Sequence, residues 1–305
     1  MKSGIDLEFM DPIRIYNRYS QSIEEESAWG ERFLRWLYQK PSGRFFERKF
    51  LSKKFFSSCV GWWMRRFWSR GYIDTFVKKY GINAEIFEKK FSEYRSFDEF
   101  FSRRIKREFR PIAAKDNQVV FPCDGRHLVV ESLKNFPIFF VKGQAFQINS
   151  FLQDRELAER FGDGSMLISR LSPVDYHRFH FPCDVLAKNP YEIRGRYASV
   201  NPLATRQCVS IFFENKRIRT LLAHPLGNIL MLEIGATCVG SIQQAFRFNT
   251  KYLKGDEKGY FRFGGSTVVL LFEKNKVQFA DDLIKYSRMG METYAFMGDE
   301  MATWV

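Results

Sequence analysis

The sequence is poor in cysteine and histidine, the residues that most often staple small folds or hold metal ions. Its 305 residues include 5 cysteines and 4 histidines. The cysteine count is odd and no Cys-x-x-Cys pair occurs, which argues against a disulfide framework or a zinc ribbon. We therefore expect reduced thiols in a cytosolic compartment. The cysteines are Cys59, Cys123, Cys183, Cys208 and Cys238.

Long apolar runs are also missing. No stretch approaches the roughly 18–20 apolar residues that a membrane-spanning helix needs, so we expect no transmembrane helix. The polar N-terminus lacks the pattern of a secretory signal. Acidic residues are fewer than basic ones, 35 against 48, which gives a formal net charge of +13. That surplus favours nucleic acid or an anionic membrane face as a partner, although a solvated basic surface without a partner also explains it.

What the sequence does contain is a large apolar fraction. Hydrophobic residues make up 45%, enough for one large catalytic domain or two modest ones. Residues 1–115 are expected to be helical and connecting. Within them, residues 44–79 mix cations with the pairs Phe55-Phe56, Trp62-Trp63 and Phe67-Trp68. This mixture suits a bilayer interface, and it equally suits a helix packed on a catalytic domain with its charges in water.

From about residue 116, short β-prone runs are separated by Gly, Pro and Asn. We predict an α+β protein with a β-rich catalytic core over 116–305, sandwich- or barrel-like and antiparallel, preceded by a helical membrane-associating region over 1–115. Ser96 and Glu99 have capping-box spacing, which predicts a short helix through Ile105, and a second helix is expected over 150–161. Phe-Pro-Cys-Asp occurs at 121–124 and 181–184. We interpret this as chance similarity, not a shared metal site, and find no internal repeat.

The strongest local signal is Gly264-Gly265-Ser266-Thr267 before the apolar run 268–272. Glycines permit unusual backbone angles, so the Ser266 hydroxyl could reach the carbonyl that precedes it. Taken alone, the motif is more typical of a plain turn. Gly164-Ser165 and Gly240-Ser241 are also Gly-Ser bonds, but the first resembles a turn before a strand and the second a pocket floor.

An acid–base cluster lies at Ser172-Pro173-Val174-Asp175-Tyr176-His177-Arg178-Phe179-His180. Histidine titrates near neutrality, so either imidazole could take a proton from a serine or return one to a carbanion. The His-x-x-His spacing also allows a metal, but further ligands are missing, and a purely structural role stays open. Asp124-Gly125 is an ordinary turn dipeptide whose carboxylate could alternatively orient a catalytic histidine.

Together these motifs resemble the signature set of phosphatidylserine decarboxylases over roughly residues 70–300. The set comprises Asp124-Gly125, 172–180, Ile234 to Ile242, Lys254 to Gly259 and Gly265-Ser266-Thr267, with Phe100 to Arg103 and Arg110 to Ile112 upstream. Many members of that family have leucine before the cleaved glycine, where this chain has Gly264.

The resemblance implies self-cleavage between Gly265 and Ser266 into a β chain, 1–265, and an α chain, 266–305. Asp124, His180 and Ser266 would act as a triad, and Ser266 would become a pyruvoyl group that forms a Schiff base with phosphatidylserine and releases carbon dioxide. His177 would protonate the resulting carbanion, Asp175 would orient its loop, and Thr267 would support the site. His127 and His224 receive no role.

The resemblance further implies the product phosphatidylethanolamine, no metal ion and no nucleic-acid partner. The α and β chains would stay associated, in a homodimer bound peripherally to anionic lipid on the cytoplasmic face of the cell membrane. Two rivals remain: a related pyruvoyl decarboxylase acting on another serine-headgroup lipid, and a basic membrane- or RNA-binding module without catalysis.

Overall fold

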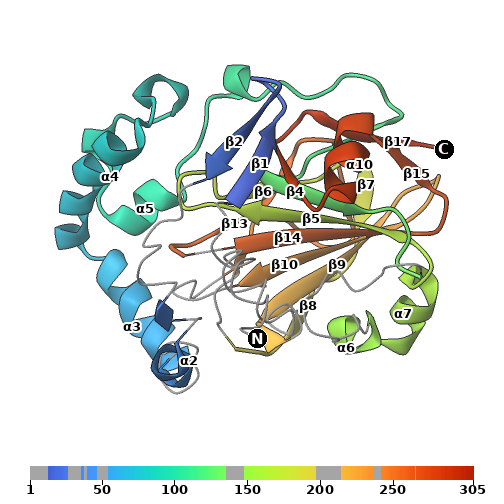
Figure 1. The fold of residues 1–305 in the computed structure, drawn as a ribbon, viewed down its shortest axis with the longest axis horizontal. Coiled ribbons are helices and arrows are strands. Elements are labelled where there is room, and N and C mark those ends of the chain that lie inside the picture. Colours follow the sequence, from blue (N-terminus) through green and yellow to red (C-terminus); the bar gives the residue numbers. More distant parts are fainter. Residues whose placement is uncertain are drawn as a thin grey trace, which may run out of the picture.

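The computed structural model describes residues 13–26, 36–37, 40–46, 54–134, 148–196, 214–235, 242–264 and 266–305. An 11-stranded sheet forms its centre, in the spatial order β12-β7-β9-β10-β14-β5-β4-β16-β1-β2 with β8 paired to β9 (Figure 1). Only β1 and β16 run parallel among the pairs of this sheet that the described residues form. Because the path has two ends, the described strands make an open sheet and not a closed barrel.

Seventeen strands are described, most of them three to seven residues long. The large sheet contains β1 (Ile13–Asn17), β2 (Ser22–Glu26), β4 (Gly125–Val130), β5 (Ser165–Leu171), β7 (Val185–Ala187), β8 (Tyr191–Ile193), β9 (Arg217–Ala223), β10 (Ile229–Gly235), β12 (Thr250–Tyr252), β14 (Ser266–Phe272) and β16 (Glu292–Ala295). Two smaller sheets contain β11 (Ile242–Gln244), β13 (Glu257–Phe261) and β6 (Arg178–His180), and β15 (Val277–Phe279), β17 (Glu300–Trp304) and β3 (Gln118–Val120).

Helices pack on both faces of the large sheet. The helices of the described residues are α2 (Pro41–Phe46), α3 (Lys54–Met64), α4 (Tyr72–Tyr80), α5 (Phe97–Phe101), α6 (Ile148–Leu152), α7 (Arg155–Phe161) and α10 (Asp281–Arg288), with short 3-10 turns between several of them. One face of the large sheet shares a core with both small sheets, and the other packs against α6 and α7. The expected β-rich α+β class is confirmed, in a layered form.

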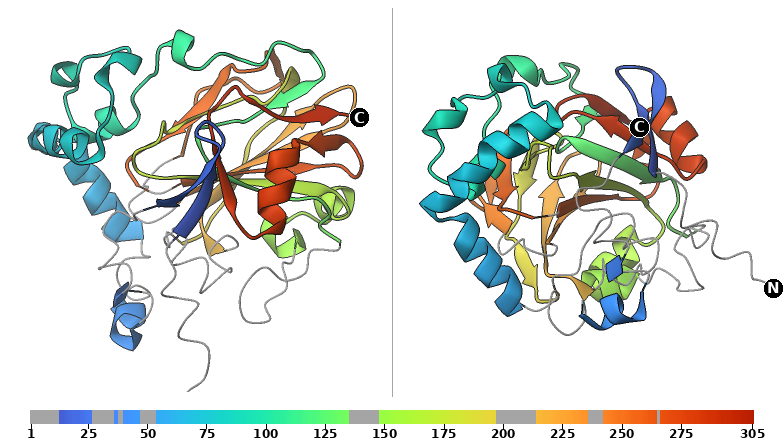
Figure 2. Two further views of the ribbon diagram at one scale, coloured as in Figure 1. Left: turned by 45° about the horizontal axis from the view of Figure 1, so that its top comes forward. Right: turned by 60° about the vertical axis from the view of Figure 1, so that its left-hand side comes forward.

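The N-terminal region differs from the expectation of helices and connections. Residues 13–26 form the β1–β2 hairpin, which extends the large sheet by pairing β1 with β16. The alternation of buried Ile13 and Ile15 with exposed Arg14 is the strand pattern that a helical interpretation overlooks. The helices α3, α4 and α5 do form, along one side of the molecule (Figure 2).

Two shorter predictions need small corrections. Ser96 caps α5 as expected, accepting the Glu99 backbone N–H at 3.2 Å, but the helix ends at Phe101 and not at Ile105. The helix expected over 150–161 is two helices, α6 and α7. They are separated at Gln153, whose φ of +49° interrupts helical geometry before Asp154 caps the second helix.

The chain contains an internal duplication, which the sequence did not reveal. One half is continuous, in the order β6, β7, β9, β10, β11, β12 and β13. The other half is split around it, with β3, β4 and β5 before and β14, β15, β16 and β17 after. The eight strands from β12 to β16 are therefore arranged symmetrically on either side of the β10–β14 pair, so that β12, β7, β9 and β10 correspond to β16, β4, β5 and β14. The two small sheets correspond to each other in the same way.

The two Phe-Pro-Cys-Asp segments occupy equivalent positions in these halves, so the interpretation as chance similarity is wrong. The residue before each segment donates its backbone N–H to the proline carbonyl of the other segment. Each segment is also hydrogen-bonded to a Gly-Asp-Glu turn, at 255–257 or 298–300. The bonds are Val120–Pro182 (2.8 Å), His180–Pro122 (2.7 Å), Phe121–Asp299 (2.9 Å) and Phe181–Asp256 (2.9 Å).

The two halves differ in how one pair of neighbouring strands is connected. In the continuous half, β9 and β10 are joined by the short turn 224–228. The equivalent strands of the split half, β5 and β14, are separated by residues 172–265, which hold the whole inserted half. Strands β5 and β14 therefore form an interrupted β-hairpin, a hairpin whose turn is replaced by an insertion. The loop after Leu171 begins that insertion, and Ser266 is the first residue after it.

Candidate functional site

Ser266 begins β14 and lies between Gly235 of β10 and Leu171 of β5. It is fully buried, and its Oγ has no hydrogen-bond partner among the residues that the structure describes. Gly264 has a φ of +139°, a conformation that side chains other than glycine rarely adopt. Gly265 lies outside the described residues. Thr267, on the opposite face of the strand, is likewise fully buried.

His177 lies in the loop that leaves β5, at the other end of the interrupted hairpin. Its Nδ1 donates to the Asp175 carbonyl at 2.9 Å, which leaves Nε2 as an acceptor. Within the described part of the chain, this buried Nε2 has no partner. Burial, aided by the charge of Arg103, lowers the pKa of His177 to about 3, so the ring is neutral. The ring packs on Phe101 at 3.8 Å between centroids.

His180 ends β6, and its imidazole is also neutral. Nδ1 donates to the Gly255 carbonyl at 2.9 Å, and Nε2 accepts from the Tyr176 hydroxyl at 3.3 Å. Burial lowers the pKa of His180 to about 4, partly opposed by the hydrogen bond to Gly255. The Gly255 carbonyl therefore fixes the tautomer of this ring, a role that the sequence motif assigned to Asp124.

Asp124 is buried in the turn before β4. Arg110 holds its carboxylate with Nε at 2.9 Å from Oδ1 and Nη2 at 2.5 Å from Oδ2, and the Met297 backbone N–H adds a bond of 2.9 Å. Burial raises the pKa of Asp124, and the bidentate pair with Arg110 opposes that rise. The sequence flagged Arg110 only as part of a motif, and its pairing with Asp124 was missed.

The structure brings two members of the candidate triad, Asp124 and His180, into one region and does not complete the triad. The His180 backbone N–H bonds to Pro122, two residues before Asp124. No side-chain hydrogen bond joins Asp124 to His180, or His180 to Ser266, among the described residues. The triad assignment accordingly stays a prediction, as do the roles of His177, Asp175 and Thr267.

Two groups hold the elements around Ser266: Arg103, which the sequence flagged only as part of a motif, and Asp98, which it did not single out. Arg103 is buried and donates through Nη2 to the carbonyls of Val174 (2.6 Å) and Asp175 (3.0 Å) in the His177 loop. Asp98 of α5 accepts the Phe263 backbone N–H at 2.9 Å, three residues before Ser266. Asp98 of α5 and Arg103, two residues after the helix ends, thus hold the segments on both sides of the interrupted hairpin.

The remaining polar candidates have structural surroundings. His127 is buried between the Ser169 hydroxyl (2.8 Å) and the Ala295 carbonyl (3.2 Å). Cys59, Cys123 and Cys183 are free thiols, while Cys208, Cys238 and the motif 236–241 lie outside the described residues. In the described ranges, no group of three or more His, Cys, Asp or Glu side chains is arranged to hold a metal ion.

Comparison with known proteins identifies the family. The family model described as phosphatidylserine decarboxylase matches residues 97–298. A phosphatidylserine decarboxylase proenzyme of Clostridium botulinum (strain 657 / Type Ba4) is 39% identical over 292 residues, covering 95% of this chain and 99% of that protein. One of Chlamydia pneumoniae is 42% identical over 277 residues, covering 90% and 92%. The chain belongs to the phosphatidylserine decarboxylase family.

Proposed function

We propose that this protein is a phosphatidylserine decarboxylase proenzyme that cuts itself between Gly265 and Ser266. The observation that carries the proposal is the setting of Ser266, a fully buried hydroxyl without a partner in the described structure, at one end of an interrupted hairpin. Cleavage at such a junction leaves β14 paired with β10 and β5. The α chain, 266–305, would therefore stay associated with the β chain, 1–265, through the sheet.

The cleavage reaction uses atoms of the chain itself. A neutral His180 takes the proton of the Ser266 hydroxyl, and Oγ attacks the Gly265 carbonyl carbon. The bond from that carbon to the Ser266 nitrogen breaks as the nitrogen takes up the proton, so that the amide becomes an ester. Elimination then removes the Cα proton of residue 266 and breaks the Cβ–Oγ bond, releasing the Gly265 carboxylate and leaving dehydroalanine at 266. Addition of water to that residue, with loss of ammonia, gives the pyruvoyl group. For His180 to act, its Nε2 must exchange the Tyr176 hydroxyl for that of Ser266.

The pyruvoyl group supplies an electron sink for the decarboxylation of phosphatidylserine to phosphatidylethanolamine. Its surroundings suit a small planar group, because the neighbouring Gly235 and Gly264 carry no side chains. His177 would hold or deliver a proton; in support, its Nδ1 donates to the Asp175 carbonyl and its Nε2 has no partner among the described residues. Asp124 and Arg110 would fix the turn beside His180, and Thr267 would support the strand.

The surface around α3 and α4 is the proposed membrane contact. Trp62, Trp63, Phe67, Trp68 and Tyr72 are 40–76% exposed. Arg65, Arg66 and Arg70 are exposed among them, and Arg66 lies 4.6 Å from the centre of the Trp62 ring. Aromatic rings and cations together bind the headgroup region of an anionic bilayer. We therefore place the protein peripherally on the cytoplasmic membrane face.

None of the helices in the described ranges is long and apolar enough to cross a bilayer. Docking through rings at headgroup depth would bring the active site to a substrate that never leaves the lipid phase. The inner side of α4 supports this arrangement, because it packs in one cluster with Val174 and Phe263, which flank the His177 loop and Ser266.

The decisive experiment replaces the hydroxyl that would start the reaction. Ser266→Ala should remain a single 305-residue chain, whereas the wild type separates into fragments 1–265 and 266–305. Ser165→Ala, at the other described Gly-Ser bond, is the matched control and should cleave normally. Intact-mass spectrometry reads both the fragments and the N-terminal pyruvoyl. Cleavage of Ser266→Ala would refute the proposal, and assays with other serine-headgroup lipids would identify a different substrate.

A further inference from the structure

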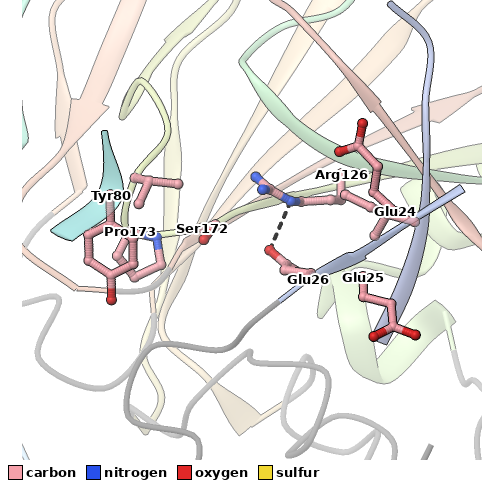
Figure 3. A pocket seen from close by; sticks show the side chains of 9 residues that line it. Glu24, Glu25, Glu26, Tyr80, Arg126, Ser172 and Pro173 are labelled. Carbon is pink, nitrogen blue, oxygen red and sulfur yellow. Dashed lines mark ion pairs between the residues drawn. The ribbon is translucent and has the colours of Figure 1, made fainter. Parts of the chain in front are cut away.

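A buried network of charges links the N-terminal hairpin to the His177 loop. Glu26, the last residue of β2, forms an ion pair with Arg126 of β4 at 2.9 Å (Figure 3). It forms a second ion pair with Arg170 of β5 at 2.6 Å. Arg126 continues to the Asp175 carboxylate, and Arg170 pairs with Glu292 at 2.6 Å. The hairpin thereby reaches the loop through two side chains.

The network is poorly accessible to solvent. The side chains of Glu26, Arg126 and Arg170 are each 9% exposed, and that of Asp175 is 2% exposed. Burial acts to raise the pKa of Glu26, but Arg170 and Arg126 outweigh it, so the pKa is lowered and the carboxylate stays charged. Buried ion pairs cost desolvation energy, and apolar residues of similar volume often stabilise a fold as well or better. Stability alone therefore does not account for this buried network of ion pairs.

The internal duplication allows the buried arginines to be compared with apolar residues at an equivalent position of the same molecule. Arg126 and Arg170 are cross-strand partners on β4 and β5. At the corresponding cross-strand position, the duplicated strands β7 and β9 pair Leu186 with Ala223. The equivalent strand pairing therefore forms with two apolar residues in place of the two arginines. The two arginines occur only in the half that contains Ser266. Their partner Glu26 belongs to the hairpin beside β16, and the described strands include no counterpart of that hairpin beside β12.

The far end of the network fixes the loop that carries His177. Asp175 Oδ2 accepts the Ser172 backbone N–H at 2.6 Å, and the Asp175 backbone N–H returns to the Ser172 carbonyl at 2.9 Å. The Asp175 carbonyl then accepts from His177 Nδ1 at 2.9 Å. One residue thus closes the turn through its side chain and orients the imidazole through its main chain.

We propose that Glu26 is a positioning residue for the active site, acting through Arg126 on Asp175 and so on the His177 ring. The proposal rests on the decarboxylase function proposed above. It assigns to the hairpin, which precedes the family-matched region 97–298, a part in catalysis without contact with substrate. The neutral side chain of Gln at 26 would leave both arginines undercompensated and free Arg126 to move, with Asp175 following.

The neighbouring Glu25 is a matched control. Both glutamates line the cavity of about 200 Å³ between the hairpin, Tyr80 and the loop 172–174. Glu25 is exposed, and within the described structure it forms none of the ion pairs that hold Glu26. Glu25→Gln therefore removes the same charge from the same strand and cavity without touching the network.

The test measures carbon dioxide release from phosphatidylserine in mixed micelles, normalised to the pyruvoyl content of each purified variant. Glu26→Gln should lower kcat about ten- to hundredfold with KM unchanged, as small displacements of catalytic groups do. Glu26→Asp should recover part of the loss, and Glu25→Gln should match the wild type. In an Asp175→Asn background, Glu26→Gln should cause little further loss, because the two changes interrupt one path.

Three outcomes would overturn the inference. They are a kcat for Glu26→Gln within twofold of wild type, an equal loss in Glu25→Gln, or full additivity with Asp175→Asn. If Glu26→Gln folds too poorly to assay, Arg126→Lys tests the same path, since it keeps the charge and removes the forked geometry. A wild type that forms no pyruvoyl would instead refute the underlying function, so the two failures are distinguishable.

Discussion

Two segments that precede the family-matched region, the β1–β2 hairpin and the helices α3 and α4, relate to the sheet in opposite ways. The hairpin is part of the sheet, and two of its charged residues, Arg18 and Glu26, are paired with partners far away in the sequence, as in the bidentate pair of Arg18 with Asp282. The helices stand along one side (Figure 2), and their largest side chains face outward. Trp62 and Trp63 are each almost half exposed.

The difference separates two uses of an N-terminal extension. The hairpin holds the C-terminal segment in place, since Arg18 also donates to the Glu300 carbonyl and Tyr19 bonds to Asp299. All three partners belong to the α chain that cleavage would create. The helical segment instead offers apolar area and positive charge to an external surface. Changes in the hairpin should therefore alter stability and catalysis, and changes in the helices should alter location.

The largest expected effect is on membrane binding. Replacing Trp62, Trp63 and Trp68 by Ser should weaken flotation with phosphatidylserine-containing vesicles by about a hundredfold or more. Each ring is about half exposed, so its transfer to the interface contributes on the order of 1–2 kcal/mol. Self-cleavage should proceed at the wild-type rate, because the site is built elsewhere. Unchanged flotation would reject this surface, and a matching loss of cleavage would erase the proposed division between the two segments.

A smaller effect is expected from the hairpin. Arg18→Ala removes the forked pair with Asp282, at 2.6 and 2.7 Å, and should lower the free energy of unfolding by about 1–3 kcal/mol. Urea unfolding of the uncleaved Ser266→Ala protein measures it on a single chain. Arg14→Ala is the control, because Arg14 is exposed on the neighbouring strand β1. Equal midpoints for the two variants would contradict the view that the hairpin clasps the C-terminal segment.

The sequence identified the family more readily than it predicted the structure that supports the candidate site. Short motifs identified the family because each of them, Gly-Ser-Thr and the histidine cluster, is a continuous stretch of sequence. The partners of these residues are not. Arg110 lies 14 residues from Asp124, and Glu26 lies 100 residues from Arg126. Charged pairing over such separations depends on strand register, which only the folded sheet defines.

The hairpin and the duplication were missed for related physical reasons. Strand β2 reads Ser-Ile-Glu-Glu-Glu, whose acidic run has low intrinsic strand preference and is stabilised by pairing with β1 and by the buried arginines. The duplicated halves keep only the residues that the crossing needs, such as Phe-Pro-Cys-Asp and the Gly-Asp-Glu turns. Strand positions between them differ in side chain, so backbone pairing reveals the repeat where sequence similarity does not.

The smallest effect concerns acid, which should act on the core and its hairpin but not on the helical surface. Burial, opposed by the hydrogen bond to Ala295 and reinforced by Arg18 and Arg126, lowers the pKa of His127 to about 3. The unfolded chain, with a histidine pKa near 6.5, binds more protons below that pH, so stability is lost as the pH falls. From pH 7 to 5.5 the loss attributable to His127 is about 1 kcal/mol.

Urea unfolding of the uncleaved protein at the two pH values, with and without His127→Asn, isolates that contribution as the difference between the two pH dependences. Vesicle binding through arginine and tryptophan should change little over the same range, because neither side chain titrates there. An identical pH dependence in the variant would mean that His127 is already neutral in the unfolded chain or charged in the folded one. A parallel fall in vesicle binding would show that the helices do not act independently of the sheet.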